Sequence, residues 1–223
     1  MQPENPKRNS NHIVLLGLAL VIVVALTVGL LLWARAKTPV TSYKTLNNYS
    51  QADGNGGFSF QKPAEITSTF KQTGPEFELS QNMPSSSTKP YKAYISGAYT
   101  TSSIALSSQE LLVLNANLIT PDNKYYGSIE TPLKTFLTDR LPQKWQLKLN
   151  HPSAFKNKTI TANAWLFTYI DTDPSSKNDP ISGELIYAVV GKNYYYFTLN
   201  ASGSTWTVNK TVWQSVTDSL KLQ

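Results

Sequence analysis

The side chains most suggestive of ion binding lie in the acidic segment 171–175 (DTDPS) and just beyond it. Oxygen ligands at alternate positions suit Ca²⁺, so Asp171, Asp173 and Asp179 are candidate ligands for weak cation binding. The sixth and twelfth positions of this run are serines, where an EF-hand loop has Gly and Glu. The segment is therefore not an EF-hand, and a long polar hairpin loop is the simpler interpretation.

A second set of carboxylates suggests hydrolysis. Glu76 and Glu78 alternate with Phe77 and Leu79, so they project from one face of a short strand. With Asp171 or Asp173 they define a hypothesis of a weak envelope hydrolase, which requires two carboxylates facing each other across a cleft. A solvated strand face is the alternative interpretation.

Nucleophilic catalysis has little support in the sequence. The chain has no cysteine, which excludes disulfides and thiolate chemistry. A Ser-His-Asp triad in the domain would have to use His151, and no Gly-x-Ser-x-Gly elbow presents a serine. We expect His151 to be a solvated loop histidine, and we predict no catalytic residue and no cofactor.

Aromatic side chains are the remaining candidates for ligand binding. Tyr194, Tyr196 and Trp206 could line a groove for a sugar or a peptide. The alternative is that they form the packing surface of a sheet. Four asparagines, Asn48, Asn157, Asn200 and Asn209, begin Asn-x-Ser/Thr sequons, which matter only in a glycosylating secretory pathway.

The net charge of +6 does not point to nucleic acid. Lysines and arginines are spread thinly, without a run that could follow a phosphate backbone. We therefore expect no nucleic-acid partner.

Residues 13–33 have the sequence of a single transmembrane helix. They contain no charged side chain, and a bilayer core needs about 20 helical residues. Lys7, Arg8, Arg35 and Lys37 flank the segment, and Trp33 occupies an interfacial position. The lipid bilayer is the partner expected for this segment.

A cleavable signal peptide is the alternative, because Ala34-Arg35-Ala36 is a small-x-small site. The charge balance across the segment does not decide its orientation. The absence of cysteine and a charged fraction of 15% favour an exported domain. We therefore expect a cytoplasmic tail at 1–12, a flexible stalk at 34–56, and an extracytoplasmic domain at 57–223.

The domain sequence predicts an α+β fold. Alternating patterns predict strands at 58–61, 76–79, 111–119, 159–170, 183–190 and 193–200, with a tight hairpin turn at Gly191-Lys192. Thr131 as the cap and Pro132 as the first residue predict a helix that ends before Pro142.

A closing helix is predicted from a stripe of aliphatic residues. Val208, Val212, Val216 and Leu220 recur every four residues, and Asn209 or Thr211 can cap the helix. Because apolar residues occupy both faces of the late strands, we expect an antiparallel sheet covered on both sides by helices.

This pattern resembles the PsbP-like family. The stretches that carry the resemblance are Gly-Phe-Ser-Phe-x-x-Pro at 57–63, the hairpin at 182–200 and the closing Trp213…Val216…Ser219-Leu220-Lys221-Leu222. The resemblance implies an α/β/α sandwich, usually exported, that serves as a binding or assembly module without catalysis.

We therefore expect a single-pass membrane-anchored protein whose exported domain is a non-catalytic binding or assembly module at the cell envelope, with a protein partner there. The carboxylate-dependent hydrolase is one alternative to this hypothesis. A structural subunit of a membrane or surface complex is the other.

Overall fold

The computed structural model of the chain describes residues 20–27, 40–53, 56–81, 92–101, 107–115, 124–141, 146–172 and 180–223. The chain divides into two units, Met1–Thr38 and Pro39–Gln223, each of which is described by itself.

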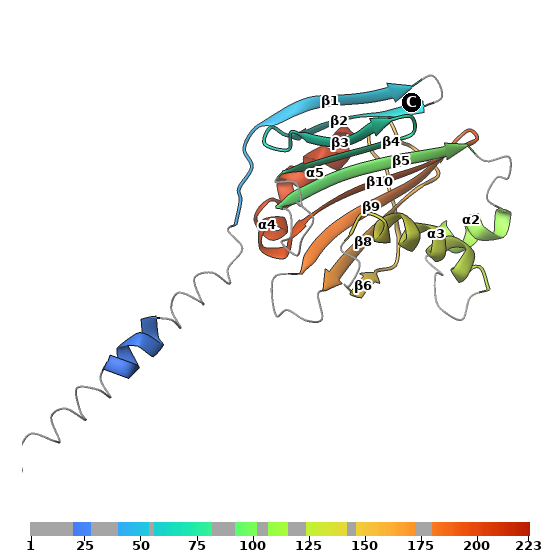
Figure 1. Cartoon of the computed structure of the whole chain (residues 1–223). Helices are drawn as coiled ribbons and strands as arrows, with labels where there is room; N and C mark the ends of the chain where they lie inside the picture. The colour runs from blue at the N-terminus through green and yellow to red at the C-terminus, as the bar shows by residue number, and fades with distance from the viewer. Residues whose placement is uncertain are drawn as a thin grey trace, which may run out of the picture. The chain divides into compact units, whose positions relative to one another are not determined.

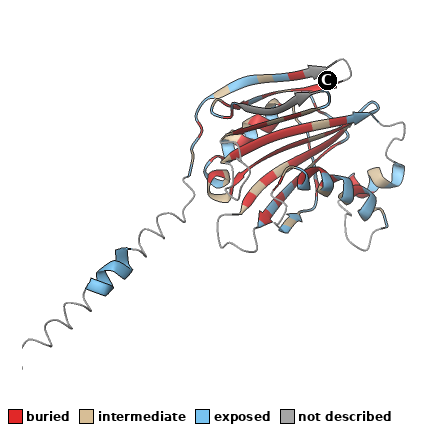
Figure 2. Ribbon diagram, viewed as in Figure 1, coloured by how far each residue is buried: buried red, intermediate tan, exposed pale blue. Residues whose placement is uncertain are grey.

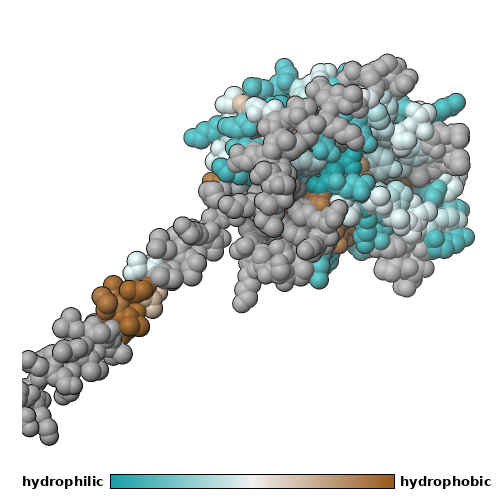
Figure 3. All heavy atoms as spheres, viewed as in Figure 1, coloured by the Kyte–Doolittle hydropathy of each residue, from teal (hydrophilic) through white to brown (hydrophobic). Residues whose placement is uncertain are grey.

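In the first unit, residues 20–27 form a helix whose apolar side chains are exposed, as the brown spheres of Figure 3 show. Among the described residues, no helix has both the length and the hydropathy that a membrane span requires. The other residues of the predicted span at 13–33 lie outside the described ranges.

The second unit is α+β, and its described residues form two antiparallel sheets (Figure 1). Its elements, in chain order, are β1 (Leu46–Asp53), β2 (Gly56–Pro63), β3 (Ser68–Thr73), β4 (Glu76–Gln81), β5 (Ala93–Thr101), α2 (Ser108–Asn115), α3 (Tyr126–Thr138), β6 (Gln146–Leu149), β7 (Ser153–Ala154), β8 (Ala164–Thr172), β9 (Ile181–Val190), β10 (Asn193–Ser202), α4 (Gly203–Val208), α5 (Lys210–Ser219) and β11 (Lys221–Leu222).

The large sheet has the strand order β3-β4-β5-β10-β9-β8-β6, and β7 also pairs with β8. Its central strands are buried along most of their length, as Figure 2 shows. The predicted hairpin between β9 and β10 is confirmed, and Gly191 adopts the positive φ of 61° that its turn requires.

Each face of the large sheet has its own core. On one face, the side chains of β8, β9 and β10 pack against Leu133, Phe136 and Leu137 of α3. On the other face, Phe77 and Phe197 of the large sheet pack against Phe58 and Phe60 of β2, and Trp213 and Val216 of α5 belong to the same core. The prediction of cover on both sides is confirmed, but a second, three-stranded sheet, β1-β2-β11, forms part of one cover.

The predicted flexible stalk at 34–56 is wrong for the part that the structure describes. Residues 46–53 form β1, which pairs with β2 along its whole length, and Tyr43 is buried. The reason is tertiary, because the segment 40–45 shows little apolar periodicity of its own and is held by the closing helices. The compact unit therefore begins at Pro39 rather than at residue 57.

The strand predicted at 111–119 is also wrong, because residues 108–115 form the helix α2. Ser107 and Glu110 form a capping box at its start. The Ser107 amide donates to Glu110 Oε2 at 2.8 Å, and the Glu110 amide donates to Ser107 Oγ at 3.2 Å. This local stabilisation of a helix outweighs the strand propensity of the apolar run that follows.

The two predicted helices differ in their boundaries from the observed ones. α3 begins at Tyr126 and contains Pro132, because buried Ile129 continues its apolar face toward the N-terminus. The closing helix is divided into α4 and α5 at Asn209, and Val208 is 53% exposed instead of buried.

Candidate functional site

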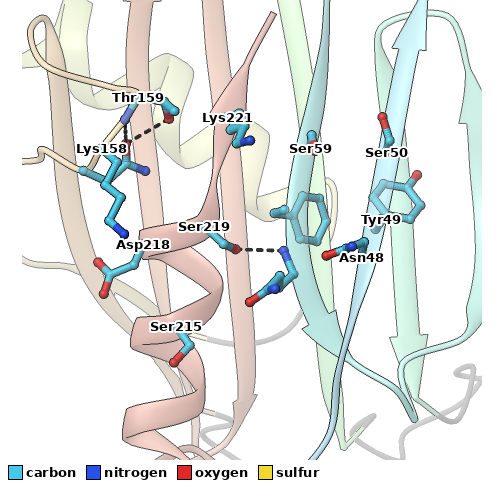
Figure 4. A pocket seen from close by; sticks show the side chains of 13 residues that line it. Asn48, Tyr49, Ser50, Ser59, Lys158, Thr159, Ser215, Asp218, Ser219 and Lys221 are labelled. Atoms are coloured by element: carbon cyan, nitrogen blue, oxygen red, sulfur yellow. Dashed lines mark hydrogen bonds between the residues drawn. The ribbon is translucent and has the colours of Figure 1, made fainter.

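A groove of about 790 Å³ opens beside the small sheet (Figure 4). One wall is formed by β1 and β2, and the opposite wall by α5 and the loop 157–159, with β11 at the upper end. The lining residues are Asn48, Tyr49, Ser50, Ser59, Phe60, Gln61, Asn157, Lys158, Thr159, Ser215, Asp218, Ser219 and Lys221.

Strand register places polar side chains in rows on the groove side of the small sheet. Ser59 pairs with Ser50 of β1 on one side and with Lys221 of β11 on the other. Gln61 pairs with Asn48 in a second row. Because side chains alternate along a strand, the same register that buries the phenylalanines of β2 turns these residues outward, with about 7 Å between the rows.

The floor beneath the first wall is aromatic. The Tyr49 ring packs against Phe60 at 5.1 Å and against Phe77 at 5.4 Å between ring centroids. Its hydroxyl is buried without a hydrogen-bond partner among the described residues, and burial raises the pKa of Tyr49 to about 12. Tyr49 thus stays neutral and makes a rigid base for the groove.

The opposite wall is fixed by hydrogen bonds of α5. Ser219 Oγ accepts a hydrogen bond from the main-chain amide of Gln61 at 2.7 Å and donates to the Val216 carbonyl at 2.8 Å. Asp218 Oδ1 accepts from Gln214 Nε2 at 2.9 Å. Ser219 therefore links α5, in one wall of the groove, directly to β2, in the other.

Asn157 closes one end of this wall. Its Nδ2 donates to the Thr217 carbonyl at 3.1 Å and to the Leu220 carbonyl at 2.8 Å, where α5 ends. Its Oδ1 accepts from the Thr159 and Ile160 amides at 2.9 and 2.7 Å. These bonds satisfy carbonyls that a helix end leaves open and hold the loop that carries Lys158.

Some lining side chains retain their hydrogen-bonding capacity. Within the described part of the chain, no hydrogen bond or ion pair joins the side chains of Asn48, Ser50, Ser59, Gln61, Lys158 and Lys221 to another residue. They comprise two amides, two hydroxyls and two ammonium groups. The groove can therefore bind a polar ligand through side chains that the fold itself does not use.

The aromatic residues predicted to bind ligand lie outside the groove: Tyr194 and Tyr196 share the α3 side of the large sheet, and Trp206 is separated from them in the other core. Tyr194 is buried beside Tyr187, and Tyr196 stacks on Phe136 of α3 at 5.2 Å, on the α3 side of the large sheet. Trp206 of α4 stacks on Trp213 at 5.6 Å in the other core. These positions fit the alternative interpretation, in which the three side chains pack the fold.

Of the three aspartates predicted to bind a cation, Asp171 lies within the described ranges and Asp173 and Asp179 do not. Asp171 is 1% exposed on β8, where it pairs with Leu147 and Ile181. Among the described residues, no group of three or more His, Cys, Asp or Glu side chains is arranged to hold a metal ion.

The carboxylates of the hydrolase hypothesis do not converge in the described structure. Glu76 and Glu78 do share one face of β4, as predicted, and both lie beside the buried side chain of Arg140, two residues after the end of α3. Asp171 lies four strands away, about 19 Å at the normal strand spacing. Glycosidase chemistry requires carboxylates within about 10 Å, so this pairing is excluded.

His151 is exposed after β6, in agreement with the expectation of a solvated loop histidine.

Sequence reasoning missed the groove because its residues come from four separate segments. Ser, Asn, Gln and Lys in short alternating strands give no motif. One signal was available: Ser59 and Gln61 are the outward partners of Phe58 and Phe60, so a predicted strand already assigned them to a polar face.

The sequence matches no protein-family model, and no curated protein is detectably similar to it. Among solved structures, the chain is similar to cyanobacterial PsbP from Synechocystis, with 12% identity, a TM-score of 0.46 and coverage of 84% of this chain and 98% of that one.

The chain is also similar to the Ran-binding protein Mog1p of Saccharomyces cerevisiae, with 7% identity, a TM-score of 0.42 and coverage of 79% and 96%. A protein of unknown function from Pseudomonas aeruginosa matches with 10% identity, a TM-score of 0.37 and coverage of 78% and 95%. With identities and TM-scores this low, we assign neither family nor function from these likenesses.

Proposed function

We propose that the Pro39–Gln223 unit is a non-catalytic binding module, and that the groove between the small sheet and α5 is where it binds a polar ligand. One observation carries this proposal: a single concave surface is lined by six side chains that form no hydrogen bond or ion pair with another described residue. In a preformed concave site, convergent polar groups fix the orientation of a ligand and supply its specificity.

The composition of the groove favours binding over cleavage. Asp218 is the one carboxylate among the described lining residues, and its Oδ1 accepts a hydrogen bond from Gln214. Ser59 and Lys221 are neighbours across two strands, but Lys221 is exposed. A lysine activates a serine when burial removes water from its amine, and an exposed lysine lacks that environment.

We further propose that residues 13–33 tether this module to a membrane, with residues 1–12 in the cytoplasm and the module outside it, at the cell envelope. The length and apolar character of the segment support this proposal. A tethered module needs no high affinity, because confinement near the membrane raises the effective concentration of an envelope ligand.

The test uses full-length protein in detergent micelles and a labelled soluble polymer fraction from the envelope of the producing cell. Ser50→Trp places an indole in the groove at an exposed position of β1, so the fold should tolerate it. Thr138→Trp, at the exposed end of α3, is the matched control. Bound label is measured at equilibrium. The ligand is then recovered, and its molecular mass is determined by mass spectrometry.

We expect Ser50→Trp to weaken binding at least tenfold, Thr138→Trp to bind like the original protein, and the recovered ligand to be chemically unchanged. Equal binding by all three proteins would refute the groove as the site. A shortened ligand would refute the non-catalytic assignment.

A further inference from the structure

We propose that the ligand of the groove is an acidic oligosaccharide, with a carboxylate at Lys221 and ring hydroxyls along the rows of Ser50–Ser59 and Asn48–Gln61. This inference rests on the proposed function, because it names the ligand class of the same groove. It follows from which groups the groove offers, how they are spaced and how they are charged.

The first step is that the groove offers side chains rather than main chain. The β2 backbone is hydrogen-bonded to β1 on one side and to β11 on the other. Where the pairing with β11 ends, the main-chain amide of Gln61 donates to Ser219 Oγ at 2.7 Å. The Leu220 carbonyl accepts from Asn157 Nδ2 and from Thr159 Oγ1, each at 2.8 Å. An extended peptide is recognised through an open strand edge, and the main-chain groups of β2 and of Leu220 that face the groove are already hydrogen-bonded.

The second step concerns the free side chains themselves. Hydroxyl and amide groups both donate and accept, so Ser50, Ser59, Asn48 and Gln61 can bond to sugar hydroxyls in either sense. The two rows lie about 7 Å apart along the strands, so a ligand with polar groups at several points along its length can contact both rows at once. A chain of sugar rings has this property.

The third step is charge. The described residues that line the groove carry two ammonium groups and one carboxylate, an excess of one positive charge. Lys158 extends toward Asp218 in Figure 4, whereas Lys221 lies at the upper end of the groove between α5 and Ser59. Both lysines lack an ion pair among the described residues, but Lys221 is the one that pairs with Ser59, so a carboxylate bound at Lys221 can also accept hydrogen bonds from the neighbouring serine hydroxyls.

The experiment measures the affinity of the full-length protein in micelles by isothermal titration calorimetry, at low and at physiological salt. The probes are tri-galacturonic acid, neutral galactotriose, and a Glu-rich peptide of equal charge to the acidic sugar. Lys221→Gln removes the charge and keeps hydrogen-bonding capacity. Lys192→Gln, in the exposed turn between β9 and β10, is the matched control.

We expect the acidic trisaccharide to bind more tightly than the neutral one and than the peptide, with the preference decreasing as salt increases. Lys221→Gln should weaken binding of the acidic trisaccharide by up to about fivefold, the upper end of the range for one exposed charge pair, without changing galactotriose binding. Lys192→Gln should leave both affinities unchanged.

Equal affinity for the two sugars, or tighter binding of the peptide, would overturn the acidic oligosaccharide. If neither sugar binds while Ser50→Trp still weakens binding of the envelope fraction, the groove is the binding site but an acidic oligosaccharide is the wrong ligand class. If Ser50→Trp has no effect on the envelope fraction, the proposed function itself fails.

Discussion

The Asn209 side chain forms hydrogen bonds with the main chain of both Thr41 and Tyr43, which lie more than 160 residues away in sequence. Its Oδ1 accepts from the Tyr43 amide at 2.8 Å, and its Nδ2 donates to the Thr41 carbonyl at 2.5 Å and to the Thr205 carbonyl at 2.8 Å. Asn209 is 1% exposed, between α4 and α5. These hydrogen bonds therefore link the segment that leads into β1, part of the groove wall formed by β1 and β2, to the closing helices α4 and α5.

Asn209→Ala should lower the free energy of unfolding by about 2–3 kcal/mol, because it leaves a buried amide and two carbonyls without partners. Chemical denaturation of the full-length protein measures the loss, and hydrogen exchange of the Tyr43 amide should accelerate. Asn48→Ala, at an exposed position, is the control and should change stability by less than about 0.5 kcal/mol. Equal stability of the two variants would show that the Asn209 contacts do not hold the segment.

Arg140→Met should also destabilise the fold, by about 1–3 kcal/mol. The Arg140 side chain is 8% exposed, and its Nε donates to Ser96 Oγ at 2.9 Å while its Nη2 lies 3.5 Å from Glu76 Oε2. Methionine preserves the apolar stem of the side chain. The loss of stability therefore measures what the guanidinium contributes, including its attraction for the partly buried carboxylates of Glu76 and Glu78.

Lys134→Met is the matched control for Arg140→Met. Lys134 forms an ion pair with Glu130 at 3.0 Å, but its side chain is 43% exposed, so its loss should cost less than about 0.5 kcal/mol. Comparable losses in the two variants, measured by the same denaturation curves, would contradict the view that Arg140 is a buried link between α3 and the sheet.

The stability of the fold should depend on the protonation of Glu184. Burial on β9 raises the pKa of the Glu184 carboxyl above its ordinary value of 4.5. The folded state therefore binds this proton more tightly than the unfolded state does. Its contribution to stability is fully present below pH 4.5 and is lost as the pH rises through the raised pKa.

Glu184→Gln removes this titration, so we expect the variant to be more stable than the original protein at pH 7 and no more stable at pH 3.5. Thermal unfolding across this pH range measures the difference. If the stability difference between the two proteins were the same at both pH values, the carboxyl would not be responsible.

The full chain should remain in the membrane pellet after alkaline carbonate extraction, and deletion of residues 13–33 should release it. The reason is the transfer free energy of an uncharged apolar helix into lipid. Protease added to intact cells should cut the module at an exposed site. Recovery of the chain in the carbonate supernatant with residues 1–36 still attached would contradict the tether.

The sequence predicted those parts of the fold whose signals are local. Phe58 and Phe60 alternate with polar residues and form β2, and the Gly191-Lys192 turn joins β9 to β10 as expected. The α+β class and the cover on both faces of the sheet followed from such patterns. Asn209 was recognised as a possible cap, but its side chain bonds to Thr41 and Tyr43 instead, through contacts that no local pattern contains.

The candidate site was missed because it is formed by register and by tertiary contact. Ser59 is a site candidate only once Ser50 and Lys221 are known to flank it, and those pairs join residues far apart in sequence. The conspicuous aromatic and acidic side chains were better signals of packing. Tyr196 stacks under α3, and Glu76 and Glu78 lie beside a buried arginine.

The most direct test of the groove is a two-dimensional NMR titration of the side-chain amides in the full-length protein, with the envelope oligosaccharide fraction that the protein retains. The Asn48 and Gln61 side-chain amides line the groove without partners among the described residues, so both resonances should shift and saturate together. The amides of Asn209 and Gln51, which donate to main-chain carbonyls inside the fold, should not move. Saturating binding that leaves Asn48 and Gln61 unshifted would contradict the proposed site.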